Sequence, residues 1–352
     1  PAEEWEDAAE FAQYFKADTI MEELYDLQSQ VSSLRSSLEK QEGQYYGIGQ
    51  SASYNKVCKM IDKAALGKVS VLLLGETGVG KEVIARSVHL RSERAEQPFI
   101  AVNCAAIPPD LIEAELFGVE KGAYTGANQS RPGRFERANT GTIFLDEVVE
   151  LTPRAQATLL RVLQEGELER VGDNRTRAVD VRVIAATNES LEKAVEEGRF
   201  RSDLFYRLNV FPVEIPGLRD RREDIPALID HFIHRYNAEE RRDVRGVRHE
   251  VLEVLTSFNW PGNVRQLENT IFRAVVLADN PYLSADDFPL LADEFQAAGI
   301  ESGPPLLGDE AAQDAASEGA SVVTRPAASG AEPEAVEIFD REGHLRSLQE
   351  IE

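Results

Sequence analysis

A glycine-rich segment that could bind phosphate follows the apolar run Val69–Leu74. It reads Gly75-Glu76-Thr77-Gly78-Val79-Gly80-Lys81, and a helical pattern begins at Lys81. Glycines let a backbone wrap around phosphates, a helix N-terminus attracts anions, and a lysine here can reach the β- and γ-phosphates. The strict P-loop pattern has Ser or Thr after the lysine as a Mg²⁺ ligand, whereas this chain has Glu82. A simple glycine-rich turn is therefore an alternative for this segment alone.

A second apolar run, Thr142–Leu145, ends in the two carboxylates Asp146 and Glu147. In P-loop enzymes the first acid holds Mg²⁺ and the second orients and activates the attacking water. An acid pair after a strand is common, so this pair decides little by itself. The order of strand, glycine-rich loop, helix, strand and acid pair nevertheless predicts an enzyme that hydrolyses a nucleoside triphosphate with Mg²⁺.

Three further groups of polar residues could act on the same phosphates. The apolar run Val181–Ala186 ends in Thr187-Asn188, which could sense the γ-phosphate and position water. The segment RFRSDLFYR at 199–207 carries arginines that either form a solvated face or reach a neighbour's nucleotide as arginine fingers. Arg265 follows Trp260-Pro261-Gly262 at the start of a helical pattern and could fold back over the phosphates.

The elements that must position these groups alternate between strand and helix. Apolar runs at Val69–Leu74, Phe99–Val102, Thr142–Leu145 and Val181–Ala186 are separated by helical patterns that begin near Ser51, Lys81, Pro109 and Pro153. This alternation predicts an α/β fold with a parallel sheet. Residues 219–292 show helical periodicity with no strand between the helices, so a small all-helical domain is expected to follow the sheet.

A heptad pattern precedes the α/β region. Its apolar positions are spaced 4, 3, 4, 3 and 4 residues apart, at Ile20, Leu24, Leu27, Val31, Leu34 and Leu38. Such a seam predicts either a coiled-coil linker that pairs two chains or a single amphipathic helix lying on its own domain. The seam spans fewer than four heptads, so both interpretations stay open.

Composition excludes several functional classes. With 38 Lys and Arg against 62 Asp and Glu, the net charge is −24, and no segment forms the basic face that duplex DNA requires. Two cysteines cannot make a disulfide framework or a cysteine-based zinc site. No apolar run reaches the roughly 18 residues of a membrane span, and the acidic start is unlike a signal peptide. We therefore expect a cytoplasmic protein without a membrane partner.

Five motifs together resemble the central ATPase domain of bacterial enhancer-binding proteins, the AAA+ activators of sigma-54 RNA polymerase. They are GETGVGKE, ELFGVEKGAYTGA, GTIFLDE, RFRSDLFYRLNVFP and WPGNVRQLEN, and the resemblance covers about residues 45–292. That family also has Glu at the position of Glu82. The segment WEDAAEFAQYFKADTIMEELYDLQSQ, followed by YYGIGQS, is similar to the aromatic-responsive branch that senses phenol and xylene.

The resemblance implies a domain order. Residues 1–18 would be the tail of a sensory domain, 19–44 a coiled-coil linker helix, 45–218 the α/β ATPase subdomain and 219–292 a helical lid. Residues 293–337, rich in Ala, Gly, Pro, Ser and Glu, read as a flexible acidic linker, and 338–352 would open a Fis-like DNA-binding domain. Aromatic effector binding and DNA binding would then belong to domains that this chain lacks.

The resemblance also assigns roles to single residues. The phosphate-binding segment would comprise Gly75, Glu76, Thr77, Gly78, Val79, Gly80, Lys81 and Glu82. Asp146 would hold Mg²⁺, Glu147 would be the catalytic carboxylate, and Asn103 would restrain that carboxylate. Thr187 and Asn188 match the first sensor, Arg265 the second, and Arg201 and Arg207 the arginine fingers that act on a neighbour. Ile48 matches a residue lining the adenine pocket.

The segment Gly122-Ala123-Tyr124-Thr125-Gly126-Ala127 matches the loop that contacts sigma-54. The family usually has Phe where this chain has Tyr124. An exposed aromatic on a glycine-flanked loop can anchor in a partner's pocket, although a plain hairpin turn with a packed tyrosine is the alternative. The partners implied are sigma-54, RNA polymerase and further copies of the chain. A six-subunit ring is expected, and the heptad seam allows a dimer at rest.

Two other functions compete with an ATP-hydrolysing activator. A generic AAA+ remodeller or helicase loader would share the nucleotide site but lack the GAYTGA sequence. A regulatory scaffold that binds nucleotide without turnover would not need both Asp146 and Glu147. Both sets of residues are present, so an ATPase that remodels the sigma-54 polymerase complex is the function that the sequence favours.

Overall fold

The computed structural model describes residues 48–123 and 129–300. The predicted sensory tail, the linker helix with its heptad seam, and the segments 301–337 and 338–352 lie outside the described residues. The same holds for Tyr124, Thr125, Gly126 and Ala127 of the GAYTGA sequence.

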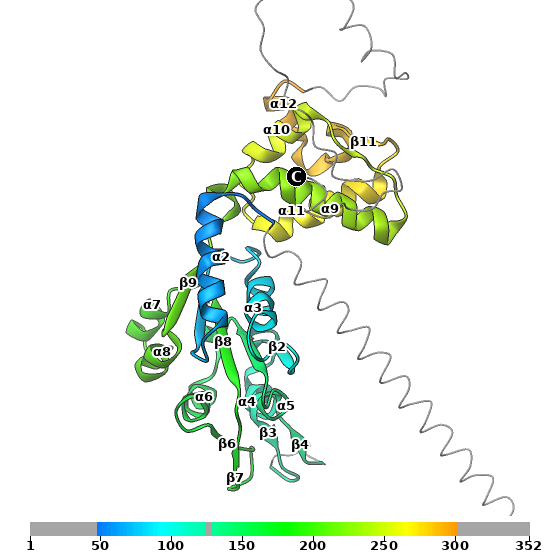
Figure 1. The fold of residues 1–352 in the computed structure, drawn as a ribbon. Helices are drawn as coiled ribbons and strands as arrows, with labels where there is room; N and C mark the ends of the chain where they lie inside the picture. The colour runs from blue at the N-terminus through cyan, green and yellow to red at the C-terminus, as the bar shows by residue number, and fades with distance from the viewer. Residues whose placement is uncertain (1–47, 124–128, 301–352) are drawn as a thin grey trace, which may run out of the picture. The chain divides into compact units, whose positions relative to one another are not determined.

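The α/β region is built on a five-stranded sheet in which every pairing is parallel (Figure 1). The strand order is β2-β5-β8-β1-β9. The strands are β1 (Val71–Leu74), β2 (Phe99–Asn103), β5 (Thr142–Asp146), β8 (Arg182–Thr187) and β9 (Phe211–Glu214). The first four confirm the predicted strands. The edge strand β9 gave no clear signal because it contains Pro212 and buries only Val213.

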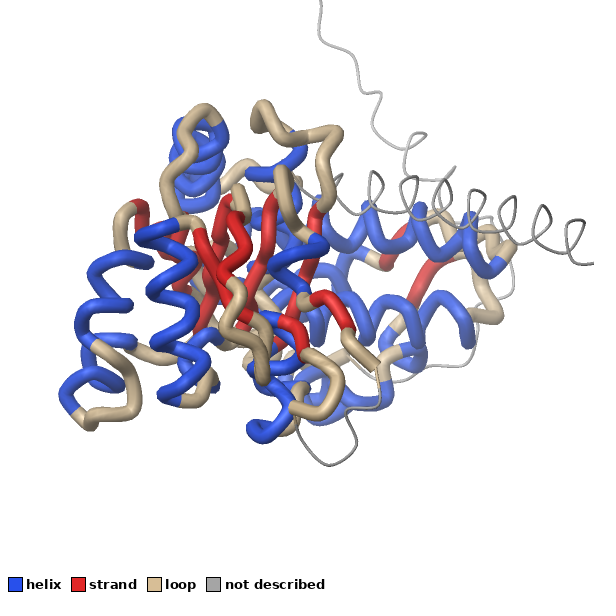
Figure 2. The backbone as a smooth tube through the Cα atoms, turned by 90° about the horizontal axis from the view of Figure 1, so that it is seen from below, coloured by secondary structure: helices blue, strands red, loops and turns tan. Residues whose placement is uncertain are grey.

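Side chains alternate between two hydrophobic cores, one on each face of the sheet. One core takes Leu72, Ile143, Leu145, Val183 and Ala185, and the other takes Val71, Leu73, Phe144, Ile184 and Ala186. Figure 2 shows the strands with helices on both sides. Because both faces are covered, the strands read as continuous apolar runs rather than as alternating ones.

Four helices of the α/β region, α2, α3, α4 and α6, begin where the sequence predicts, whereas α5, α7 and α8 were not predicted. The side chains of Ser51 and Thr152 accept hydrogen bonds from the first turns of α2 and α6, which explains two of these starts. The helices are α2 (Ala52–Ala65), α3 (Lys81–Leu90), α4 (Pro109–Phe117), α5 (Arg134–Arg137), α6 (Pro153–Glu165), α7 (Leu191–Glu196) and α8 (Ser202–Leu208), with short 3₁₀ turns η2 (Cys104–Ala106) and η3 (Val148–Glu150).

Two antiparallel hairpins extend from the α/β region. One pairs β3 (Gly118–Val119) with β4 (Arg131–Pro132), and the other pairs β6 (Glu167–Glu169) with β7 (Thr176–Ala178). They contact each other, because the Glu120 N–H donates to the Val171 carbonyl at 3.0 Å. The GAYTGA sequence lies between β3 and β4, in the connection of the first hairpin.

A helical subdomain follows β9. It contains α9 (Ile225–Glu240), α10 (His249–Ser257), α11 (Asn263–Leu277), α12 (Ala292–Ala297) and the 3₁₀ turns η4 (Leu218–Asp220), η5 (Arg222–Asp224), η6 (Ala285–Asp287) and η7 (Pro289–Leu291). The prediction of no strand in this region is wrong, since β10 (Gly246–Val247) and β11 (Tyr282–Leu283) form a short parallel ladder. Two residues per strand are too few to disturb a helical period.

No helix in the described part of the chain is long and apolar enough to cross a membrane.

The helical subdomain also extends past residue 292, where the sequence analysis expects a flexible linker. Helix α12 covers most of the extension, and Phe295 is 2% exposed in the same core as Trp260 and Phe232. The composition of this segment does not indicate packing, because Phe295 is a single aromatic residue among alanines and acidic residues. The predicted boundary is therefore several residues too early.

Candidate active site

A cavity of about 380 Å³ lies beyond the carboxyl ends of β1 and β5. Ligands of open α/β sheets bind at this edge. The wall on the sheet side comprises Thr77, Gly78, Val79, Gly80, Lys81, Glu82, Asn103, Asp146 and Glu147. The wall on the other side includes Leu228, Phe232, Arg235, Val264, Arg265 and Glu268 of the helical subdomain. The two sequence signals, the glycine-rich loop and the acid pair, thus share one cavity.

The glycine-rich loop adopts a backbone that requires glycine. Gly78 and Gly80 have φ angles of 82° and 101°, and a Cβ on Gly78 would lie 2.4 Å from the carbonyl oxygen of Gly262. Lys81 opens α3, and its Nζ donates to the Gly75 carbonyl at 3.0 Å. The loop therefore curls around the lysine, as a phosphate-binding loop does. Glu82 lines the cavity and pairs with Arg86 at 3.0 Å.

The acid pair occupies the end of β5. Glu147 has a left-handed backbone with φ 52°, and its Oε1 lies 3.4 Å from Lys81 Nζ. Asp146 accepts the Glu147 N–H at 3.1 Å. Burial raises the pKa of Asp146, and the charge of Lys81 partly opposes this shift. A cation beside Asp146 would oppose it further.

The residues at this cavity fit Mg²⁺ only together with a nucleotide. In the described ranges, no cluster of three or more His, Cys, Asp or Glu side chains is arranged to hold a metal ion. Magnesium, however, is commonly held by one or two carboxylates plus substrate phosphates and water. Asp146 lines the cavity beside the glycine-rich loop, so it can provide such a carboxylate.

Asn103 lies beside the acid pair but does not bind Glu147. It ends β2 in register with Asp146, and its Oδ1 accepts the Ala106 N–H at 3.3 Å. Among the described residues, no hydrogen bond joins Asn103 to Glu147. The asparagine instead caps the turn η2, while Glu147 faces Lys81 and Asn188.

The predicted sensor after β8 divides into two roles. Thr187 is buried, and its hydroxyl exchanges hydrogen bonds with the backbone of Glu189, which shapes the turn. The Asn188 N–H donates to Glu147 Oε2 at 3.3 Å, and its Nδ2 donates to Thr77 Oγ1 at 3.1 Å. Asn188 therefore joins the glycine-rich loop to the acid pair, as Lys81 also does.

The predicted arginine fingers are exposed and do not line the cavity of their own chain. Arg201 precedes α8 and pairs with Asp203 at 2.8 Å. Arg207, in the last turn of α8, donates to the Leu163 carbonyl at 3.0 Å. Exposed arginines outside the chain's own site are available to a neighbouring molecule.

Arg265 and Ile48 both line the cavity. Arg265 is exposed near the start of α11, and its N–H donates to the Gly78 carbonyl at 3.2 Å. Ile48 lies with Leu228 and Phe232 at an apolar part of the wall that suits a flat base.

Two predicted residues of the loop do not line the cavity. Gly75 supplies the carbonyl that Lys81 binds, while the Glu76 carboxylate bonds Arg219 and Asn263. The hydrogen bonds from Arg219 and Asn263 lower the pKa of Glu76 to about 2. Sequence reasoning missed Arg219 and Asn263, since both lie far along the chain from the loop.

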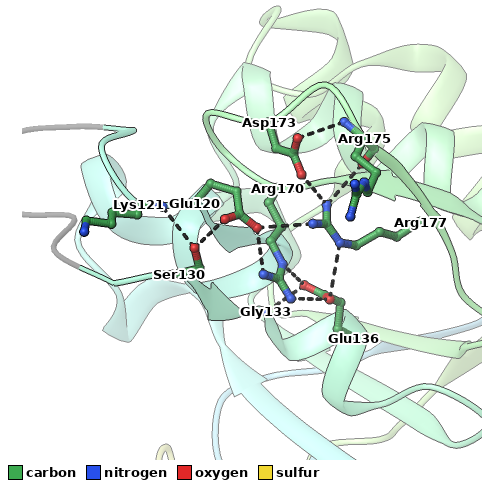
Figure 3. A network of polar contacts seen from close by, with 9 residues as sticks. All are labelled: Glu120, Lys121, Ser130, Gly133, Glu136, Arg170, Asp173, Arg175 and Arg177. Carbon is green, nitrogen blue, oxygen red and sulfur yellow. Dashed lines mark hydrogen bonds and ion pairs between the residues drawn. The ribbon is translucent and has the colours of Figure 1, made fainter.

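A network of ion pairs joins the two hairpins (Figure 3). Arg170 makes two contacts of 2.8 Å with Glu136 and one of 2.8 Å with Glu120. Arg177 approaches Glu120 at 3.2 Å. Ser130 donates to Glu120 as well and accepts the Lys121 N–H at 3.2 Å, so residues on both sides of the GAYTGA sequence are tied together. The contacts with Glu136 and Glu120 raise the pKa of Arg170, with Glu136 as the largest cause.

Two family models match the chain in succession. The Sigma-54 interaction domain matches residues 47–214, and the AAA+ ATPase lid domain matches residues 219–302. The transcriptional regulatory protein XylR of Pseudomonas putida is 67% identical over 279 residues, which are 79% of this chain and 49% of XylR. The phenol regulator MopR of Acinetobacter guillouiae is 56% identical over 284 residues, 80% of this chain and 51% of MopR. The chain thus spans about half the length of these curated relatives.

A solved structure supports the same fold. The crystal structure of NtrX from Brucella abortus in complex with ATP is 36% identical, with a TM-score of 0.65 over 74% of this chain and 57% of NtrX. NtrX has also been solved in complex with ADP. The predicted fold, a parallel-sheet P-loop NTPase followed by a helical lid, is confirmed. The helical subdomain is hereafter called the lid.

Proposed function

This chain belongs to the AAA+ sigma-54-dependent transcriptional activators, and we propose that it hydrolyses ATP to remodel the closed complex of sigma-54 RNA polymerase. The observation that carries the proposal is the cavity that brings together Lys81, Asp146 and Glu147. The family is one of ATPases, and both carboxylates that hydrolysis needs are in place.

The geometry suggests how the chain would prepare ATP for hydrolysis. Bound Mg²⁺, held by Asp146, would neutralise charge on the phosphates. The Glu147 carboxylate contacts Lys81 and accepts the Asn188 N–H. A γ-phosphate would compete for Lys81, which would release Glu147 to orient the attacking water. Asn188 would keep the Glu147 carboxylate close to the glycine-rich loop. Asn103 would restrain the same carboxylate if its side chain rotated away from the Ala106 N–H.

Hydrolysis is proposed to require a second copy of the chain. Arg201 and Arg207 are exposed and stand outside their own cavity, as fingers acting on a neighbour's nucleotide would. The working unit would be a ring, with six subunits by family resemblance. A resting dimer through the heptad seam is a further expectation.

Coupling to sigma-54 is assigned to the GAYTGA loop, with Tyr124 and Thr125 as the contacting residues. The support is the ion-pair network, which connects the hairpin carrying the loop to the neighbouring hairpin. Contacts with an aromatic effector and with DNA are proposed to lie outside this chain, which spans about half the length of XylR and MopR; MopR is named a phenol regulator. Because transcription takes place in the bacterial cytoplasm, the proposal places the chain there.

The proposal is tested by the dependence of ATP turnover on protein concentration. A ring with fingers acting in trans predicts that turnover per subunit rises steeply as subunits assemble. Absence of turnover at every concentration would contradict the proposal and favour a nucleotide-binding scaffold. Turnover without trapping of sigma-54 by rings that hold an ATP transition-state mimic would favour a generic AAA+ remodeller.

A further inference from the structure

Three successive carbonyls of the glycine-rich loop are bound by residues that follow the last strand of the sheet. Each acceptor has a different donor: two donors lie in the first turn of α11, and the third lies between the turns η4 and η5 at the entry to the lid. The pairs are Asn263 Nδ2 to Thr77 O at 3.1 Å, the Arg265 N–H to Gly78 O at 3.2 Å and Arg221 Nη2 to Val79 O at 3.1 Å. The loop that should receive phosphates is thus held from behind by another subdomain.

This arrangement directs the N–H groups of the loop. The described residues contain no cis peptide bond, so in each planar peptide the N–H points opposite to the carbonyl. Because the carbonyls of Thr77, Gly78 and Val79 point toward the lid, the N–H groups of the next residues, Gly78, Val79 and Gly80, point away from it. Within the described part of the chain, none of those N–H groups donates to a protein acceptor. Three aligned donors without a protein partner form a nest for an anion.

Asn263 is built to hold its contact in one orientation. It is fully buried, and its Oδ1 accepts the Leu218 N–H at 2.8 Å, so its Nδ2 must be the donor to Thr77. The same Nδ2 donates to Glu76 Oε2 at 3.0 Å. Arg219 Nη1 donates to the same Glu76 oxygen at 2.9 Å. A series of hydrogen bonds therefore runs from Arg219 through Glu76 to Asn263 and ends on the Thr77 carbonyl.

We infer that Asn263, oriented by Glu76 and Arg219, is a positioning residue through which the lid preorganises the phosphate-binding N–H groups of the loop. The inference rests on the proposed binding of ATP at this cavity. It assigns Glu76 to the lid contact rather than to the nucleotide. It also means that a change in the lid alters the affinity for phosphates without touching the apolar wall where the base would lie.

The test replaces Asn263 by Asp and compares ADP with adenosine, which has no phosphate. Aspartate keeps the size, tolerates the φ of 52° at this position and can still accept the Leu218 N–H. It places an oxygen against Glu76 and the Thr77 carbonyl, where a donor is required. Losing such a buried contact predicts a roughly 10- to 100-fold weaker affinity for ADP, with adenosine affinity within about threefold of the original. Calorimetry on the full chain measures both.

Asn269→Asp is the matched control, since Asn269 is exposed on the same helix and does not line the cavity. It should leave both affinities unchanged. The melting temperature without nucleotide reports whether each variant folds. An Asn263→Asp protein that folds and binds ADP normally would overturn the inference, as would an equal loss for ADP and adenosine.

A milder variant keeps the inference testable if Asn263→Asp does not fold. The side chains of Arg219 and Glu76 are 43% and 44% exposed, so Arg219→Gln should fold. Releasing Glu76 predicts a roughly 3- to 10-fold loss of ADP affinity and none for adenosine. Unchanged ADP affinity in this variant would overturn the inference by itself. If the unaltered chain binds no more ADP than Lys81→Ala, the proposed function fails instead.

Discussion

Glu147 stands at the end of a buried strand with a left-handed backbone, which turns its side chain toward Lys81 and the Asn188 N–H. A non-glycine residue in this conformation costs free energy, and such strain is common at functional positions. The position of Glu147, more than its mere presence after Asp146, makes it the candidate catalytic carboxylate.

Replacing Glu147 by Gln should retain ATP affinity and lower turnover by at least about tenfold. The amide has the same shape, but it cannot accept a proton and orients water less well. Binding of a labelled ATP analogue and phosphate release, measured on one preparation, check the two parts. Turnover above about a tenth of the original would remove Glu147 from the catalytic role. Glu150→Gln, a change three residues further along the chain at a position outside the cavity wall, serves as the control.

At the scale of the elements, local sequence patterns predicted the strands and helices whose signals lie within the elements themselves. Three of the four recognised strands, β1, β5 and β8, are apolar runs with side chains in both cores, and two of the four recognised helix starts, those of α2 and α6, have a capping Ser51 or Thr152. The glycine-rich loop and the acid pair were likewise local. The contact of Asn263 with Glu76 was not predictable, since 187 residues separate the two and neither has a motif for the other. Helix α12 and the two-residue ladder of the lid were too short or too polar to give a period.

The two hairpins form an element whose purpose can be tested apart from the nucleotide site. Arg170→Gln removes the cation that holds Glu136 and Glu120, so the base of the GAYTGA loop should lose its fixed position. Open-complex formation should then fall by at least about tenfold more than ATP turnover falls. Arg175→Gln is the control, because Arg175 is exposed on the same hairpin. Equal losses in both assays for Arg170→Gln would show that the network supports folding or hydrolysis rather than coupling.

At the scale of the whole molecule, the account requires that subunits complete one another's sites. Arg207→Ala should reduce turnover by roughly 10³-fold or more, as the loss of arginine fingers does elsewhere. Mixing Arg207→Ala with Lys81→Ala subunits should restore part of the turnover, because some interfaces then combine an intact Lys81 with an intact Arg207. If confirmed mixed assemblies recover no activity at any ratio, the arginine does not act in trans.

The central claim is that ATP hydrolysis in one subdomain is coupled to sigma-54 through the GAYTGA loop. Thr125 offers neither a base nor a charge to hydrolysis, so Thr125→Ala should leave ATP turnover and ring assembly largely intact. Tyr124→Phe, which restores the residue usual in the family, should preserve every activity.

The decisive measurement is open-complex formation by Thr125→Ala, assayed beside ATP turnover and sigma-54 trapping on the same preparation. We expect normal turnover with no trapping and no open complex. Normal open-complex formation would contradict the account directly, and a joint loss of turnover and stability would reduce the loop to a structural hairpin.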